Sequence, residues 1–284
     1  MDKKISIIIG TRPEAIKLAP LAKSLNDFGG FRTTLINTGQ HSNLLEGLLD
    51  YWDLKFDFEF KIAPGEGNRF LLPTLLNNLN MLLQEIETDL VIVQGDTASA
   101  LSGAMVAYSL NLPIAHIEAG LRSGDLSNPN PEEGYRRAID TISNLHFAPS
   151  AKALSNLEFE GHAESSYNVG NTVVDSLLHI QKLLNEDEKF KEIAKNELPN
   201  SLPKNYIVFT QHRREGFGEG QSRVFKAISE LAKVGHPVIF PVHPNPKVAS
   251  LADSYFSGLR NVYMIKPLSY ISMVRLWTIC WLYC

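Results

Sequence analysis

Acidic side chains occur at two points where a buried strand is expected to end. Asp96 follows the apolar run 90–93 after a Gln-Gly pair, and Glu118 directly follows the apolar run 114–117. An unpaired carboxylate in such surroundings is costly, so Glu118 is expected either to pair with nearby Arg122 or to face a reaction cleft. Asp96 is expected either to cap the next helix or to transfer protons. Both positions are therefore candidates for general acid and base chemistry.

A third acidic position follows the long polar loop 122–130. Glu132 begins the next predicted helix, directly after Pro131. Loops of this length are often functional, but a helix dipole favours any acid in the first turn. The residue type alone leaves both interpretations of Glu132 open.

Cationic side chains follow the first strand candidate. Arg12 and Lys17 lie in the first turns of a predicted helix, where Thr11 and Glu14 have the spacing of a capping box. The free N–H groups of a helix N-terminus attract anions, and two positive charges strengthen that attraction. The segment is therefore either an anion site or a well-capped surface helix.

Histidines and an arginine follow two strand candidates in the second half. His212 and Arg213 come after the run 206–210, and His243 comes after the run 238–242. Side chains of these types suit acid and base steps and contacts with a polyanion. Together with the carboxylates they indicate a polar, phosphorylated substrate without naming a reaction.

Other chemistries are excluded by pattern and composition. The chain has no Walker A loop, and it has no GxGxxG loop that would indicate a nicotinamide cofactor. It has no HExxH motif, and its two cysteines are Cys280 and Cys284, so a metal site is not expected. A formal net charge of −4 provides no basic field for nucleic acid. No cofactor, metal or nucleic-acid partner is predicted.

The same features predict a cytoplasmic protein with no membrane partner. The first apolar run, 5–9, is too short for a secretory signal. The longest apolar-rich stretch, 271–284, is too short to span a bilayer and contains Arg275. A body free of cysteine fits a reducing compartment.

The elements that must position these side chains alternate between short apolar strands and amphipathic helices. An apolar stripe runs along the first helix at Leu18, Leu21, Ala22 and Leu25. Such alternation predicts parallel sheets, and open parallel sheets bind ligands beyond the carboxyl ends of their strands. The predicted strands are 5–9, 33–36, 90–93, 114–117, 146–148, 206–210, 238–242 and 262–265.

A change in composition marks a domain boundary. The charged segment 185–189 is followed by Pro199 and Pro203, before a fresh strand candidate. The sequence therefore predicts an α/β protein with two Rossmann-like, doubly wound parallel-sheet domains that face a cleft. The predicted parts are an N-terminal Rossmann-like domain with the carboxylates at 1–182, a linker region at 183–204 and a C-terminal Rossmann-like domain at 205–284.

Seven strings of residues occur in an order that one known family shares. They are GTRPEAIK (10–17), GDT (95–97), HIEAGLRSG (116–124), PEE (131–133), GNTVVD (170–175), HRRE (212–215) and PVHPNP (241–246). The chain resembles bacterial UDP-N-acetylglucosamine 2-epimerases of the non-hydrolysing type, and the match extends to about Pro267. One string is a weak signal, whereas seven in order are not explained by chance.

The resemblance implies a GT-B-like architecture with a nucleotide sugar between two Rossmann-like domains. It implies reversible epimerisation of UDP-N-acetylglucosamine at C2, by elimination and re-addition of UDP through a glycal, with no metal or NAD. The product of such enzymes feeds envelope and capsular polysaccharides. Members are commonly homodimers, and in some of them UDP-N-acetylglucosamine is also an allosteric activator.

The resemblance also assigns roles to positions. The family's catalytic carboxylates and histidine fall on Asp96, Glu118, Glu132 and His212. Its nucleotide-binding basic pair falls on Arg12 and Lys17, and its substrate or activator positions fall on Gln40, His41 and His243. Further substrate-binding candidates in or beside the shared strings are Arg122, Arg136 and Arg213. In this context Asp96 and Glu132 are predicted to be catalytic.

Two departures from the family pattern qualify these expectations. Tyr135 stands where the family commonly has Asn. After Tyr270 the match dissolves, and the family's segments that bind uridine, ribose and diphosphate do not follow. The second domain is therefore expected to be incomplete, with a string at 277–284 that resembles out-of-frame translation. The chain is expected to be less stable and less active than longer relatives.

Three alternatives stay open at this stage. A hydrolysing relative would release UDP and free N-acetylmannosamine. A GT-B glycosyltransferase fits the carboxylate and HRRE strings less well. A non-catalytic remnant would fit the departure after Tyr270.

Overall fold

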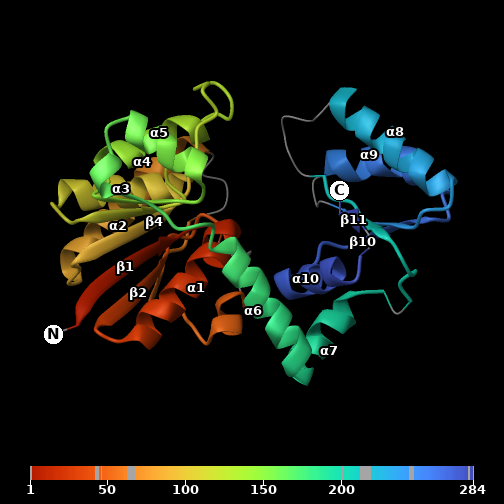
Figure 1. Cartoon of the computed structure of the whole chain (residues 1–284), viewed down its shortest axis with the longest axis horizontal. Helices are drawn as coiled ribbons and strands as arrows, with labels where there is room; N and C mark the ends of the chain where they lie inside the picture. The colour runs from red at the N-terminus through yellow and green to blue at the C-terminus, as the bar shows by residue number, and fades with distance from the viewer. Residues whose placement is uncertain are drawn as a thin grey trace. The chain divides into compact units, whose positions relative to one another are not determined.

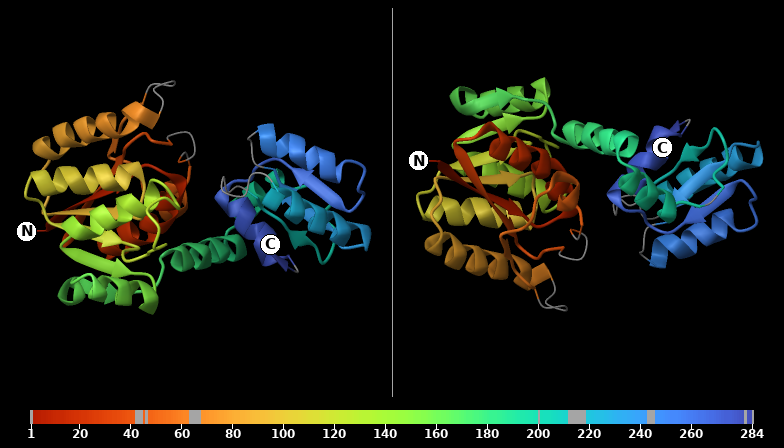
Figure 2. Two further views of the ribbon diagram at one scale, coloured as in Figure 1. Left: turned by 90° about the horizontal axis from the view of Figure 1, so that it is seen from above. Right: turned by 90° about the horizontal axis from the view of Figure 1, so that it is seen from below.

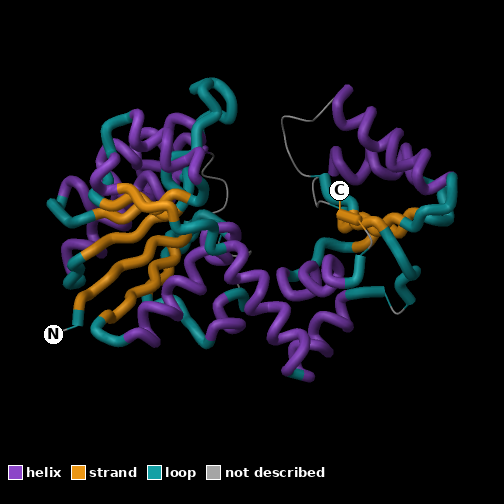
Figure 3. Tube along the Cα trace, in the orientation of Figure 1, coloured by secondary structure: helices purple, strands orange, loops and turns teal. Residues whose placement is uncertain are grey.

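The computed structural model describes residues 2–41, 45, 47–62, 68–199, 201–211, 219–242, 246–280 and 282–283. The chain divides into two compact units, Met1–Ser176 and Leu177–Cys284, and the division falls inside α6 (Val173–Glu186). Each unit is a sheet flanked by helices (Figures 1 and 3). Within the described residues, no helix is both long enough and apolar enough to cross a membrane.

The first unit is built on a seven-stranded parallel sheet with the order β3-β2-β1-β4-β5-β6-β7. The chain moves outward from β1 to β3 and then returns to add β4 on the other side of β1. A reversal of this kind is a topological switch point, where open α/β sheets bind ligands. The strands are β1 (Lys3–Ile9), β2 (Phe31–Asn37), β3 (Phe58–Glu59), β4 (Leu90–Gln94), β5 (Ile114–Ile117), β6 (Leu145–Ala148) and β7 (Ser166–Asn168).

Helices cover both faces of this sheet (Figures 1 and 2). α2, α3 and α4 pack side by side on one face, where they share a core with Ile8, Val93 and Ile114. α1 lies on the other face, and Leu18 and Ala22 of its predicted stripe are fully buried. The helices are α1 (Arg12–Phe28), η2 (Leu49–Trp52), α2 (Asn68–Glu85), α3 (Ala98–Ser109), α4 (Glu132–Ile142), α5 (Ala151–Phe159) and η3 (Ala163–Ser165).

The second unit has a four-stranded parallel sheet with the order β10-β9-β8-β11. Because side chains alternate along a strand, Phe209 and Phe240 join an aromatic core with α8 and α9, while Val208 and Ile239 face a second core that includes α10. The elements are α7 (Glu188–Glu197), β8 (Ile207–Val208), α8 (Glu219–Lys233), β9 (Val238–Pro241), α9 (Pro246–Phe256), β10 (Val262–Ile265), α10 (Tyr270–Thr278) and β11 (Leu282–Tyr283).

The predicted α/β class with parallel sheets is confirmed, and every predicted strand run contains a strand. The run 206–210 is shorter than expected, since only Ile207 and Val208 are strand residues. Three strands were not predicted: β3, β7 and β11, of two or three residues each. All three lie at sheet edges. Short edge strands carry little of the continuous apolar pattern that reveals a central strand.

Candidate active site

Polar side chains gather where β1, β4 and β5 end, beside the switch point of the first unit. Arg12 and Lys17 follow β1, Asp96 follows β4, and Glu118 follows β5. Parallel strands place their carboxyl ends at one edge of the sheet. The fold therefore brings to one edge residues that lie about 100 positions apart in the sequence.

The carboxylate of Glu118 accepts three side-chain hydrogen bonds. Lys17 Nζ lies 2.6 Å from Oε2, and Gln94 Nε2 lies 2.5 Å from the same oxygen. Asn171 Nδ2 lies 2.7 Å from Oε1. The Glu118 side chain is only 13% exposed. Because these partners are all donors, the geometry presents Glu118 as an ionised carboxylate, the form that takes up a proton.

The backbone of Glu118 is left-handed, with φ of 67°. This region is unfavourable for a residue other than glycine, and residues held in it are concentrated at functional sites. The main-chain N–H of Glu118 donates to Phe147 O at 3.0 Å. The alternative that Glu118 pairs with Arg122 is wrong, because Lys17 from α1 occupies that role.

Asp96 pairs with Arg136 on α4. The expectation that Asp96 caps the next helix is wrong, because α3 is capped by Thr97, whose hydroxyl accepts the N–H of Ala100. Glu132 is the first residue of α4 and half-buried. Since residues four apart share a helix face, Glu132 lies on the side of α4 that presents Arg136 to Asp96.

Glu133, next to the predicted Glu132, anchors this helix start. It is fully buried, and Arg136 Nη1 lies 3.4 Å from its Oε2. Burial alone would raise the pKa of Glu133, but the N–H of Ser123 and the guanidinium of Arg137 outweigh it, so the pKa lies below its ordinary value. Glu133 therefore ties the polar loop to the helix that carries Arg136.

Glu14 is a buried residue of the site for which only a capping role was predicted. Its Oε2 accepts the N–H groups of Gly10 and Thr11 at 2.9 and 2.6 Å. Its Oε1 accepts the hydroxyl of Thr97 at 2.6 Å. Burial raises the pKa of Glu14, and these hydrogen bonds offset part of the rise. Glu14 thus joins the turn after β1 to the turn that carries Asp96.

Gln40 and His41 follow β2 at the same edge. Gln40 Oε1 accepts both the N–H and the hydroxyl of Ser99, at 3.1 and 2.6 Å. These bonds turn the amide NH2 of Gln40 away from Ser99. The N–H of His41 donates to Gly10 O at 2.9 Å, and burial lowers the pKa of His41.

Arg122 is held by protein groups. Its Nε and Nη2 donate to the two carboxylate oxygens of Glu160 at 2.8 and 2.5 Å, and Nη2 also donates to Asp140 at 2.7 Å. Its Nη1 donates to Leu121 O at 2.7 Å. This geometry fits a positioning role, and substrate binding by Arg122 stays a prediction.

Three predicted residues, His212, Arg213 and His243, lie outside the described residues. Across the part of the chain that the structure describes, no group of three or more His, Cys, Asp or Glu side chains has an arrangement that would hold a metal ion.

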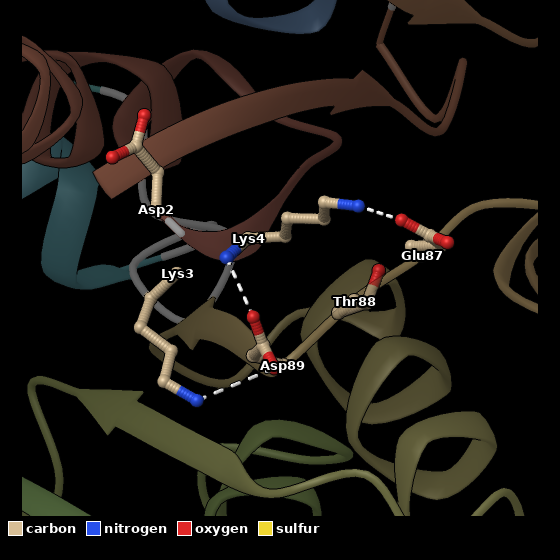
Figure 4. Close-up of a pocket in the computed structure, with 6 residues that line it drawn as sticks. All are labelled: Asp2, Lys3, Lys4, Glu87, Thr88 and Asp89. Atoms are coloured by element: carbon tan, nitrogen blue, oxygen red, sulfur yellow. Dashed lines mark hydrogen bonds and ion pairs between the residues drawn. The ribbon is translucent and has the colours of Figure 1, made fainter. Parts of the chain in front are cut away.

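A surface pocket of about 470 Å³ lies at the opposite, amino-terminal edge of the sheet. Figure 4 shows Lys3 and Lys4 from the start of β1 beside Glu87 and Asp89, which precede β4. The lysines pair with these acids, Lys3 with Asp89 at 3.6 Å and Lys4 with Glu87. Both lysines of this pocket are thus paired within the protein, and Asp2 adds a third carboxylate to its lining, unlike a site built for an anion.

The two Rossmann-like units define a GT-B-like α/β protein. The same fold occurs in the crystal structure of UDP-GlcNAc 2-epimerase from Neisseria meningitidis bound to UDP-GlcNAc, at a TM-score of 0.91 and 31% identity over 98% of this chain and 76% of that one. The model of the UDP-N-acetylglucosamine 2-epimerase family matches residues 23–283, so the expectation that the match ends near Tyr270 is wrong. The chain belongs to this family and is an isomerase.

Two further relatives agree with this assignment. The UDP-N-acetylglucosamine 2-epimerase of Campylobacter jejuni is 35% identical over 97% of this chain and 74% of the relative. The Methanocaldococcus jannaschii enzyme in complex with UDP-GlcNAc and UDP has a TM-score of 0.83 and 29% identity, over 99% of this chain and 78% of that one.

Proposed function

We propose that this chain interconverts UDP-N-acetylglucosamine and UDP-N-acetylmannosamine without hydrolysis, for the synthesis of envelope or capsular polysaccharide. The main support is the carboxylate of Glu118, fixed by Lys17, Gln94 and Asn171 at the end of β5. Its three donors hold one ionised group in one orientation beside the switch point. That is the setting a proton acceptor requires.

The chemistry explains why carboxylates and cations are needed together. The hydrogen on C2 is not acidic, because no carbonyl lies next to that carbon. In the proposed reaction UDP leaves C1 with the C–O electron pair while a base removes the C2 proton, which leaves a C1–C2 double bond. A proton then adds to the opposite face of C2 as UDP returns to C1. Groups on two faces of the sugar are therefore required.

The roles proposed for the described residues follow from their positions. Glu118, Asp96 and Glu132 are the acid and base candidates at the ends of β5 and β4 and at the start of α4. Arg12 and Lys17 at the start of α1 hold the diphosphate, since a helix N-terminus and fixed cations stabilise the charge of departing UDP. His212 is proposed as the fourth catalytic group.

The proposal is tested by incubating the purified chain with UDP-N-acetylglucosamine in D2O and following the reaction by NMR. We expect UDP-N-acetylmannosamine that carries deuterium at C2. Stoichiometric free N-acetylmannosamine and UDP would indicate the hydrolysing reaction instead, and absence of turnover would refute catalysis by this chain.

The Glu118→Gln variant tests the role of the Glu118 carboxylate as the proton acceptor. It should lower kcat by about 1000-fold, because an amide cannot accept the proton. Glu158→Gln on the exposed side of α5 is the matched control and should keep the parent rate. Equal rates for the two variants would remove Glu118 from the mechanism.

A further inference from the structure

Two histidines lie side by side on the neighbouring strands β5 and β6 of the first unit. His116 and His146 are register partners in the parallel ladder, and both side chains are fully buried. Neither belongs to the acid and base groups proposed above. Both contact Asp140 on α4, but through different atoms.

The ring of His116 contacts two acceptors. Nδ1 lies 2.6 Å from Asp140 Oδ1, and Nε2 lies 2.8 Å from the carbonyl oxygen of Gly95. A carbonyl oxygen only accepts, and an ionised carboxylate only accepts. Both ring nitrogens must then carry hydrogen, which makes the ring an imidazolium.

The surroundings of Asp140 support its ionised form. Its Oδ2 accepts the N–H of Gly120 at 3.1 Å and Nη2 of Arg122 at 2.7 Å. Burial alone would raise the pKa of Asp140, but His116 and Arg122 outweigh it and lower the pKa to about 2. Glu160 completes this cluster of charged side chains by accepting a hydrogen bond from Nη2 of Arg122.

His146 provides the contrast. Its Nε2 contacts the main-chain oxygen of Asp140 at 2.8 Å, and its Nδ1 lies 3.1 Å from the hydroxyl of Ser165. The one hydrogen of this hydroxyl can point to His146 Nδ1 or to the carbonyl oxygen of His162 at 3.2 Å. When it points to His146, a single ring hydrogen on Nε2 satisfies both contacts of the ring. Burial lowers the pKa of His146, which favours this neutral ring.

We propose that His116 is a buried imidazolium that positions the turns carrying Asp96 and Glu118. It holds the carbonyl of Gly95, whose N–H donates to Ile117 O at 3.0 Å, so the residue before Asp96 is bound to β5 through both its N–H and its carbonyl. Through Asp140 it also holds the N–H of Gly120, two residues after Glu118. The inference rests on the proposed roles of Asp96 and Glu118.

The protonation state is measured first, on the wild-type chain labelled with 15N-histidine. The titratable and charged groups near the ring are Asp140 from α4, His146 from β6 and, beyond Asp140, Arg122 and Glu160. We expect two protonated ring nitrogens for His116 at pH 7.5 and one for His146. A single protonated nitrogen on His116 would overturn the imidazolium assignment, whether or not the chain turns over substrate.

Kinetics then test the positioning role with His116→Gln and the matched variant His146→Gln. His116→Gln should lower kcat about 100-fold with KM within about threefold, because small displacements of catalytic groups cost this much. His146→Gln should stay within about threefold of the parent. Equal losses of kcat in the two variants would refute the proposal.

Asp140→Asn serves as a second variant should His116→Gln fail to fold. It keeps the shape of the side chain but removes the charge that pairs with His116, so it should reproduce the kcat loss. Parent kcat in a folded Asp140→Asn chain would also refute the proposal.

Discussion

The ammonium of Lys17 lies 2.6 Å from the carboxylate of Glu118, and both side chains are largely buried, at 19% and 13% exposed. One residue comes from α1, which follows β1, and the other directly follows β5. Because β4 lies between β1 and β5 in the sheet, the pair spans the carboxyl end of β4 beside the switch point. A cation and a carboxylate that are both shielded from water interact more strongly than a surface pair does.

Removal of this cation should impair the reaction more than it impairs the fold. Lys17→Met keeps the length of the side chain but deletes the charge, so kcat/KM should fall about 100-fold, the scale of losing one charge-stabilising donor. Lys23→Met on the same helix is the control, since the Lys23 side chain is 40% exposed and, among the described residues, its ion pair is with Asp27 at 2.8 Å. Steady-state kinetics should give Lys23→Met the kcat/KM of the parent. A similar loss for both variants would contradict a specific role for Lys17.

Glu14 should contribute to stability through the turns that it joins. Glu14→Ala leaves two buried N–H groups and one hydroxyl without their acceptor, so the free energy of unfolding should fall by about 2 to 4 kcal/mol. Glu14→Gln retains an oxygen and should lose less. Urea denaturation measures both, with Glu158→Ala on an exposed helix position as the control. Equal free energies for Glu14→Ala and Glu158→Ala would show that the bonds of Glu14 contribute nothing.

The pH dependence of stability should carry a contribution from Asp140. Its pKa is about 2 in the folded chain against an ordinary value of 3.8. A lowered folded-state pKa stabilises the fold above pH 3.8, and this contribution of about 2 kcal/mol is lost as the pH falls to about 2. The difference in free energy of unfolding between the parent and Asp140→Asn should therefore shrink over this window. A constant difference would argue against the shifted pKa.

Gly10 should not tolerate a side chain. A Cβ at this position would lie 1.9 Å from Ser99 Oγ and 2.4 Å from Thr38 Oγ1. Gly10→Ala should therefore lower the free energy of unfolding by about 1 to 3 kcal/mol and reduce activity, because Ser99 also orients Gln40. Gly134→Ala in α4 is the matched control, since a Cβ at Gly134 would meet no described atom within 4 Å. Alanine there should be neutral or stabilising by up to about 1 kcal/mol. The reverse order of stabilities would contradict the close contact at Gly10.

The central strands of both sheets and the first amphipathic helix were predictable because their pattern is local. The runs 5–9 and 114–117 are apolar except for Ser6 and His116, which is typical of strands covered on both faces. The position of Asp96 and Glu118 at strand ends follows from the same pattern. The edge strands β3, β7 and β11 were missed, since two or three residues at an edge leave too short a signal.

The order of residues alone was enough to predict the α/β class, the carboxylates at strand ends and, through seven ordered strings, the family. The long-range partners of these residues were revealed only by the folded chain: Glu118 pairs with Lys17 rather than Arg122, and His116 pairs with Asp140. The difference arises from distance along the chain. Hydrophobic periodicity is set by neighbours within a few residues, whereas ion pairs and buried hydrogen bonds depend on how crossovers bring together segments 20 to 101 residues apart.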